Sequence, residues 1–67
     1  MEEYQQRVVK EKDELDVKIK ALQAFTCAAA FSDLDEIDQK LLLRQSGLMQ
    51  LYSSTLAQRI ARFGWTR

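Results

Sequence analysis

The chain has 67 residues, with ten basic and ten acidic side chains that cancel to zero net charge, one cysteine, and no proline or histidine. This length allows one small domain, and the composition excludes an internal disulfide and a zinc site, two usual means of stabilising so short a chain. The zero net charge argues against duplex nucleic acid as the main partner, because such proteins normally carry a basic stripe.

The composition also indicates a cytoplasmic protein that makes no membrane contact. The acidic start at residues 1–3 is followed by no apolar stretch and does not resemble a signal peptide. The longest nearly uncharged stretch, residues 21–32, is too short and too polar to span a bilayer. A lone cysteine suits a reducing compartment.

The first half of the chain predicts one amphipathic helix over about residues 2–24. The absence of proline permits helix there, and apolar residues recur at steps of three, four or seven. This stripe consists of Met1, Tyr4, Val8, Leu15, Ile19, Leu22 and Phe25.

A second helix is predicted over about residues 36–63, after a loop over about residues 26–35. Ser32 or Asp35 can cap its first turn, and Gly64 is a natural stop. The alanines at 28–30 either extend the first helix or form an extra turn. The second helix has apolar residues at Ile37, Leu41, Leu48, Leu51, Leu56, Ile60 and Phe63.

This second helix has more apolar surface than one partner helix covers. One side contains Leu41, Leu48, Tyr52, Leu56 and Phe63. The adjacent side would face water in a single hairpin, and such a patch generally marks a contact. We therefore expect an all-α fold, an antiparallel two-helix hairpin of coiled-coil type that forms a single domain over residues 1–67 and assembles into a homo-oligomer. The expected oligomer interface consists of Leu42, Met49, Ile60 and Trp65.

Two details of this helix have alternative explanations. Gly47 lies inside the helix, where glycine is unfavourable, so either another helix or a ligand needs room beside the backbone. Trp65 either anchors a neighbouring subunit or belongs to a frayed end.

The sequence contains no recognisable catalytic constellation. No histidine is present as a general base, no serine or cysteine has an evident activating partner, and no glycine-rich phosphate loop occurs. Carboxylate pairs such as Asp13 and Asp16 are expected to be solvated on a charged helix face. We expect a protein that is not an enzyme and that has no cofactor or metal.

Polar residues close to the apolar stripes suggest a binding site. Gln45, Tyr52 and Arg59 recur every seven residues and therefore share a face of the second helix. Either these groups fix register by bonding among themselves, or they line a pocket between subunits in which cations hold phosphates and a tyrosine stacks on a base. The candidate ligand-binding residues are Arg7, Lys12, Tyr52, Ser53 and Arg59.

Several segments resemble a family of small phage helical-hairpin proteins related to a crAss-like phage product. In the first half these are residues 7–12, 14–16 and 18–20, with Leu22 and Phe25. The second half contributes Phe31, Leu34, Gln39, Leu42, Gln45, Met49, Tyr52, Ser53, Leu56, Arg59, Ile60 and Phe63. This resemblance covers nearly the whole chain.

The family is similar in size and architecture to phage anti-defence sponges, which sequester cyclic nucleotides or cyclic ADP-ribose variants in the host cytoplasm. The resemblance therefore implies an oligomeric protein that binds an immune nucleotide messenger without turnover. A helical module that inhibits or scaffolds a host or phage protein is the alternative, and a purely structural coiled coil is the third.

Overall fold

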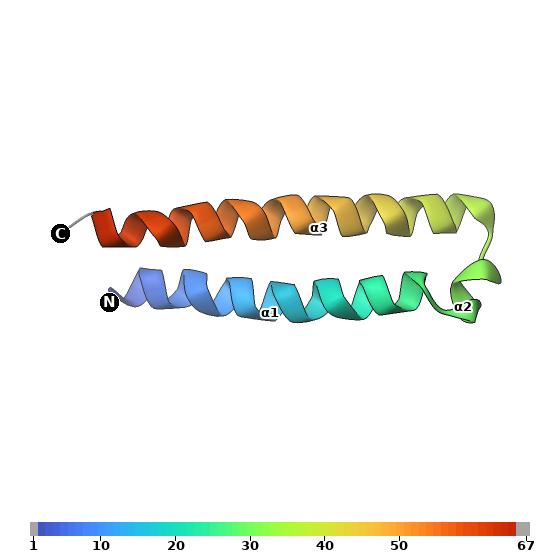
Figure 1. Ribbon diagram of the computed structural model, residues 1–67, viewed down its shortest axis with the longest axis horizontal. Helices are drawn as coiled ribbons and strands as arrows, with labels where there is room; N and C mark the ends of the chain where they lie inside the picture. The colour runs from blue at the N-terminus through green and yellow to red at the C-terminus, as the bar shows by residue number, and fades with distance from the viewer. Residues whose placement is uncertain (1, 66–67) are drawn as a thin grey trace.

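The computed structural model describes residues 2–65 as two long antiparallel helices joined at one end by a short turn (Figure 1). Helix α1 spans Glu3–Thr26, helix α2 spans Ala29–Ser32, helix α3 spans Glu36–Arg62, and a 3-10 turn, η1, spans Phe63–Trp65. The molecule is a rod of 51 × 14 × 14 Å. The expected all-α fold with packed helices is confirmed for the described residues. Met1, which was assigned to the first stripe, lies outside them.

The two long helices meet along a coiled-coil seam. Buried and half-buried positions in both helices follow each other at alternating steps of three and four, the spacing of a heptad repeat. In α1 these positions are Gln5, Val8, Lys12, Leu15, Ile19, Leu22 and Thr26, with Val9 and Asp16 half-buried beside them. In α3 and η1 they are Gln39, Leu42, Ser46, Met49, Ser53, Leu56, Ile60 and Phe63.

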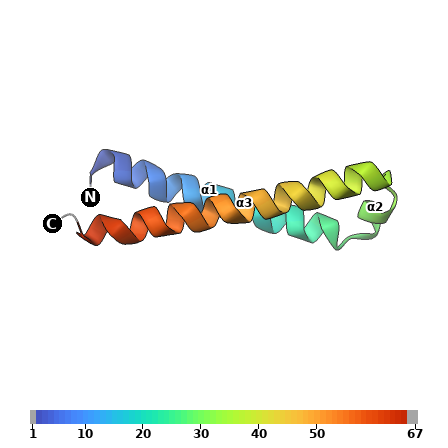
Figure 2. The same cartoon turned by 90° about the horizontal axis from the view of Figure 1, so that it is seen from above.

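Two contacts set the register of this seam. Asp16 of α1 accepts a hydrogen bond from Ser53 of α3, and the ring of Tyr4 meets the ring of Phe63 edge-on at 5.9 Å between centroids. Both contacts place α1 residues opposite α3 residues in reverse order, as an antiparallel pair requires. Seen from above, the helices cross near the middle of the rod (Figure 2).

The apolar core of this seam is small. Among the described residues its buried apolar members are Val8, Leu15, Ile19 and Leu56, and Leu56 is only 1% exposed. A core of this size leaves little reserve of stability.

The structure divides the apolar residues of α3 differently from the sequence-based expectation, although Leu56 and Phe63 of the first side do lie in the core. Met49 and Ile60, expected at an interface between subunits, pack against the core inside the hairpin, and Leu42 is half-buried in the same seam. Leu41 and Leu48 face outward, 55% and 57% exposed. Leu48 and Leu56 do not lie on one straight stripe, because a step of eight residues rotates the side chain by about 80° around the helix axis. Leu56 therefore points into the seam while Leu48 points outward.

The turn between α1 and α3 is held by local bonds. The alanine segment forms the extra turn α2, and Phe31 of this turn meets Phe25 edge-on at 6.2 Å. Asp35 caps α3 by accepting from the Ile37 N–H at 3.2 Å, so the predicted cap is confirmed. Gln39 donates from Nε2 to the carbonyl oxygen of Leu34 at 2.9 Å and so ties the turn to α3.

Within residues 2–65, neither long helix combines the length and the apolar character that a bilayer crossing needs.

Gly47 lies in open space, since a Cβ built at this position meets nothing within 4 Å. Close approach of another helix of this chain therefore does not account for it. We expect Gly47→Ala to stabilise the hairpin by about 0.5–1 kcal/mol, because alanine is the better helix former and restricts the unfolded chain. Urea unfolding checks this as a higher midpoint with an unchanged slope. A lower midpoint would mean that a partner backbone contacts this position.

Candidate functional site

The centre of the seam contains a polar network in place of apolar contacts. Ser53 Oγ donates to Asp16 Oδ1 at 2.5 Å, and Lys12 Nζ donates to Asp16 Oδ2 at 2.6 Å. All three side chains are half-buried. Asp16 was expected to be solvated, but the heptad places it at the edge of the seam, where Ser53 of the other helix reaches it. Both carboxylate oxygens are used, so the network is satisfied within the hairpin.

This network lowers the pKa of Asp16. The hydrogen bond from Lys12 is the largest cause, the bond from Ser53 is the next, and the lysine charges add to them, while partial burial acts in the opposite direction. The carboxyl group is therefore held ionised more firmly in the folded chain than in the unfolded chain.

The lowered pKa predicts a loss of stability in acid. A group whose pKa falls on folding stabilises the folded state above its unfolded pKa, about 4 for an aspartate, and this contribution is lost as the pH falls through the folded value. Asp16 makes the free energy of unfolding fall as the pH is lowered. We expect Ser53→Ala to reduce this fall, because the substitution removes one hydrogen bond to the carboxylate. The midpoint of urea unfolding, measured at several values from about pH 7 to about pH 2, reports this pH dependence. Ser54→Ala, at an exposed neighbouring serine, serves as the control and should keep the wild-type profile; an unchanged profile in Ser53→Ala would contradict the role of this bond.

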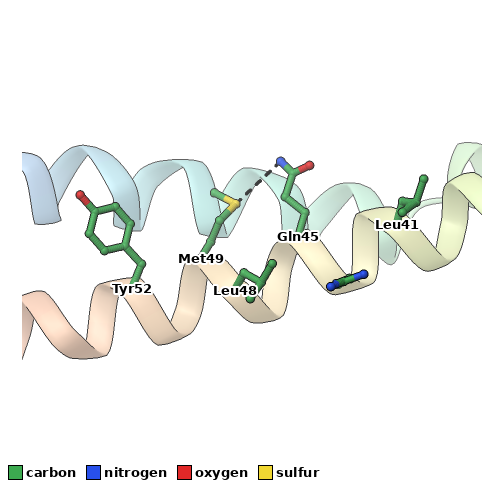
Figure 3. A pocket seen from close by; sticks show the side chains of 6 residues that line it. Leu41, Gln45, Leu48, Met49 and Tyr52 are labelled. Atoms are coloured by element: carbon green, nitrogen blue, oxygen red, sulfur yellow. Dashed lines mark hydrogen bonds between the residues drawn. The ribbon is translucent and has the colours of Figure 1, made fainter.

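A second feature lies on the outward side of α3. An open hollow of about 440 Å³ is lined by Leu41, Arg44, Gln45, Leu48, Met49 and Tyr52. Figure 3 draws these side chains along α3, with Tyr52 at one end, Leu41 at the other, and Gln45, Leu48 and Met49 between them. Gln45 Nε2 points toward Met49 Sδ at 3.9 Å, a weak contact.

The lining of this hollow combines an apolar surface with a few polar groups. Leu48 and the 45% exposed ring of Tyr52 offer flat apolar area, while Arg44 and Gln45 supply donors. The volume lies within the range of small-molecule sites, about 300–1,000 Å³, and such sites share this mixture. An aromatic ring and a guanidinium in the lining of one hollow are suited to a ligand that contains both a ring and a phosphate.

The structure distributes the five residues predicted to bind a ligand over three places. Lys12 and Ser53 meet in the seam through Asp16, whereas Arg7 is exposed on α1 and pairs with Glu3 at 2.6 Å. Tyr52 lines the hollow, and Arg59 lies two turns beyond it on the same exposed face. The side chain of Trp65, the fourth expected interface residue, lies outside the described part of the chain.

The sequence analysis did not identify Asp16 as a contact between the helices, and it did not identify most of the residues that line the hollow. The signal for the hollow was available, because Gln45 and Tyr52 were placed on one face and Leu41 and Leu48 lie beside them. The signal for Asp16 was absent, since its partner Ser53 is 37 residues away. In residues 2–65, no group of three or more His, Cys, Asp or Glu side chains is placed to hold a metal ion.

Together, the heptad seam and the outward hollow define a small helical-hairpin protein of coiled-coil type. The chain belongs to the Sequestin family, whose model matches residues 2–62. It is also 43% identical over 60 residues to an uncharacterized 7.5 kDa protein from the denB–rIIB intergenic region of enterobacteria phage T4, a match that covers 90% of this chain and 94% of the relative. These matches support a family of small phage proteins, and they do not test the expected link to crAss-like phages. No solved structure matches the chain significantly.

Proposed function

We propose that this protein is a non-catalytic phage protein that sequesters a nucleotide second messenger of bacterial immunity in the host cytoplasm. The observation that carries the proposal is the outward hollow, whose lining has an exposed tyrosine at one end and also contains an arginine and a glutamine. The family name suggests sequestration and supports the same function. Cyclic oligonucleotides and cyclic ADP-ribose variants combine a purine ring with phosphates, and they are the ligand class proposed.

Each part of the hollow has a role in this proposal. Tyr52 stacks on the base, Arg44 holds a phosphate, and Gln45 bonds to a polar edge. Of the five residues predicted from the sequence, Tyr52 and Arg59 are retained as ligand contacts. Lys12 and Ser53 are already bonded to Asp16, so using them would break a satisfied network.

Calorimetry tests the proposal directly. The purified chain is titrated with cyclic dinucleotides, cyclic trinucleotides and cyclic ADP-ribose isomers, with AMP as the control for non-specific stacking. We expect one member to bind with a dissociation constant of about 10 µM or lower, which corresponds to about −7 kcal/mol. Chromatography of the recovered ligand should show it unchanged. Heats no larger than those of AMP across the whole panel would exclude the proposal.

A second candidate is a helical module that binds a host or phage protein. The exposed leucines of α3 favour it, because an amphipathic helix commonly docks into an apolar groove of a partner. This function predicts that the chain recovers one protein at equal stoichiometry from infected-cell lysate, and that Leu48→Glu abolishes the recovery.

A further inference from the structure

Helix α1 carries a lysine on the side of the hairpin where the hollow lies. Lys18 directly precedes the seam residue Ile19, just as Gln45 and Tyr52 of the hollow directly precede seam serines of α3. These three positions are equivalent in the heptad repeat, because each precedes a seam residue that is reached by a step of four. A half-turn about an axis perpendicular to the plane of the hairpin exchanges two antiparallel helices and keeps equivalent positions on the same side. Lys18 therefore shares a side of the seam with Gln45 and Tyr52.

Asp16 marks the other side of the seam. It accepts the bond from Ser53 across the two helices, and it lies two residues before Lys18, which is about 200° of rotation around α1. Lys20 lies four residues after Asp16 and only about 40° from it around the helix, so it belongs to the side of Asp16. Near the middle of the rod, the two neighbouring lysines of α1 are thus divided between the two sides, and Lys18 is the one on the side of the hollow.

The register of the seam also brings Lys18 to the level of the hollow. Because the helices are antiparallel, the residue two positions after Asp16 lies at the level of the residue two positions before Ser53, which is residue 51. Counting instead from the ring contact between Tyr4 and Phe63 gives residue 49. Both values fall within the range of α3 that lines the hollow, residues 41–52. Lys18 is therefore beside the hollow in both directions, around the rod and along it.

The charge of Lys18 is not used inside the hairpin. Its side chain is exposed, and within residues 2–65 it forms no ion pair; the same holds for Arg44 of the hollow. One free cation thus comes from each long helix. Glu11 and Glu14 precede Lys18 on α1 and therefore lie toward the Tyr52 end of the hollow, since the helices run in opposite directions. An anion is accordingly favoured away from that end, at the level of Lys18 and Arg44.

We propose that Lys18 is a further binding residue of the hollow and holds a phosphate group of the ligand from the side of α1. This inference rests on the proposed function, because it assigns a contact to the same ligand. The base stacks at the Tyr52 end, and the phosphate lies between the ammonium group of Lys18 and the guanidinium of Arg44. A lysine is suited to this role, since its long flexible stem carries a compact charge with three donors that can turn toward an anion.

Calorimetry of three lysine variants tests this contact, with the cyclic nucleotide that binds the wild-type chain most tightly. Lys18→Ala should raise the dissociation constant about five- to tenfold, the loss expected for one charge-assisted bond at a partly exposed site. Lys18→Arg keeps the charge and should restore most of the affinity. Lys20→Ala is the matched control, because it removes the same side chain from the side of Asp16, and it should bind as the wild type does. Circular dichroism should show wild-type helix content in all three variants.

The salt dependence of the loss separates a charge contact from a structural effect. The difference in affinity between the wild type and Lys18→Ala should shrink as salt is added, because ions screen an exposed pair of charges. A normal affinity in Lys18→Ala, an equal loss in Lys20→Ala, a loss that Lys18→Arg does not restore, or a loss that salt leaves unchanged would each overturn the role of Lys18. In those cases the wild-type chain still binds, so the proposed function stands. A wild-type chain that binds no cyclic nucleotide would overturn both.

Discussion

Leu56→Ala is expected to unfold most of the protein at room temperature. Leu56 is 1% exposed and is the buried apolar residue that α3 contributes to the core, facing Val8, Leu15 and Ile19 of α1. Truncating a buried leucine to alanine costs about 2–5 kcal/mol, through lost transfer free energy and the cavity that remains. The total stability of a hairpin of this size is of similar magnitude, roughly 3–5 kcal/mol. Circular dichroism should show a large loss of helix and of the cooperative thermal transition.

Leu43→Ala is the matched control for this prediction. The same atoms are removed from the same helix, but Leu43 is 53% exposed. Alanine is at least as good a helix former as leucine, so the free energy of unfolding should change by no more than about 0.5 kcal/mol. Equal losses in both variants would show that the core does not depend on Leu56. A Leu56→Ala chain that stays folded only at high concentration would show that association with a second copy adds to its stability.

The helices themselves were predictable from the sequence because the local signals agree. The apolar steps of the first half anticipated the buried residues Val8, Leu15 and Ile19, and the acidic turn before the second helix anticipated the cap at Asp35. Few residues in either helix conflict with helical propensity, chiefly Gly47 and the Ser-Ser-Thr segment at residues 53–55. Local patterns were sufficient for fold class.

The choice of stripe on α3 was not predictable from apolar residues alone. The outward stripe has Leu41 and Leu48, and the seam has Leu42 and Met49 at the next positions, so these apolar residues do not show which stripe faces α1. The pairing depends on contacts across the two helices, such as the apolar cluster around Leu56 and the bond from Ser53 to Asp16. Such contacts depend on the register of two distant segments, and no single segment reveals them.

The same reasoning separates the two polar regions of the protein. The group at Lys12, Asp16 and Ser53 has its hydrogen bonds satisfied inside the hairpin and acts on stability and register. The outward group around Tyr52 has donors and a ring that face solvent. The sequence suggested a single face that either sets register or binds a ligand. The structure places these two groups on neighbouring faces of α3, because Tyr52 and Ser53 are consecutive residues, about 100° apart around the helix.

Tyr52→Ala is expected to weaken binding of the proposed nucleotide ligand at least fivefold while leaving the fold unchanged. The ring is 45% exposed at one end of the hollow, so its removal opens no cavity in the core. Stacking of a base on an aromatic side chain contributes about 1–3 kcal/mol, which corresponds to a factor of roughly five to 150 in affinity. Calorimetry with the ligand found for the wild-type chain gives the measurement, and thermal unfolding without ligand gives the check on the fold.

Two further variants assign the loss to stacking at this position. Tyr52→Phe keeps the ring and removes only the hydroxyl, so it should retain most of the affinity if the ring face carries the contact. Arg7→Ala removes an exposed cation that pairs with Glu3 on α1, away from the hollow, and should bind as the wild type does. The reverse pattern, in which Tyr52→Ala binds normally and Arg7→Ala does not, would move the site from the outer face of α3 to α1. Equal losses in Tyr52→Phe and Tyr52→Ala would assign the contact to the hydroxyl, and the ligand would then be held at its polar edge and not at its base.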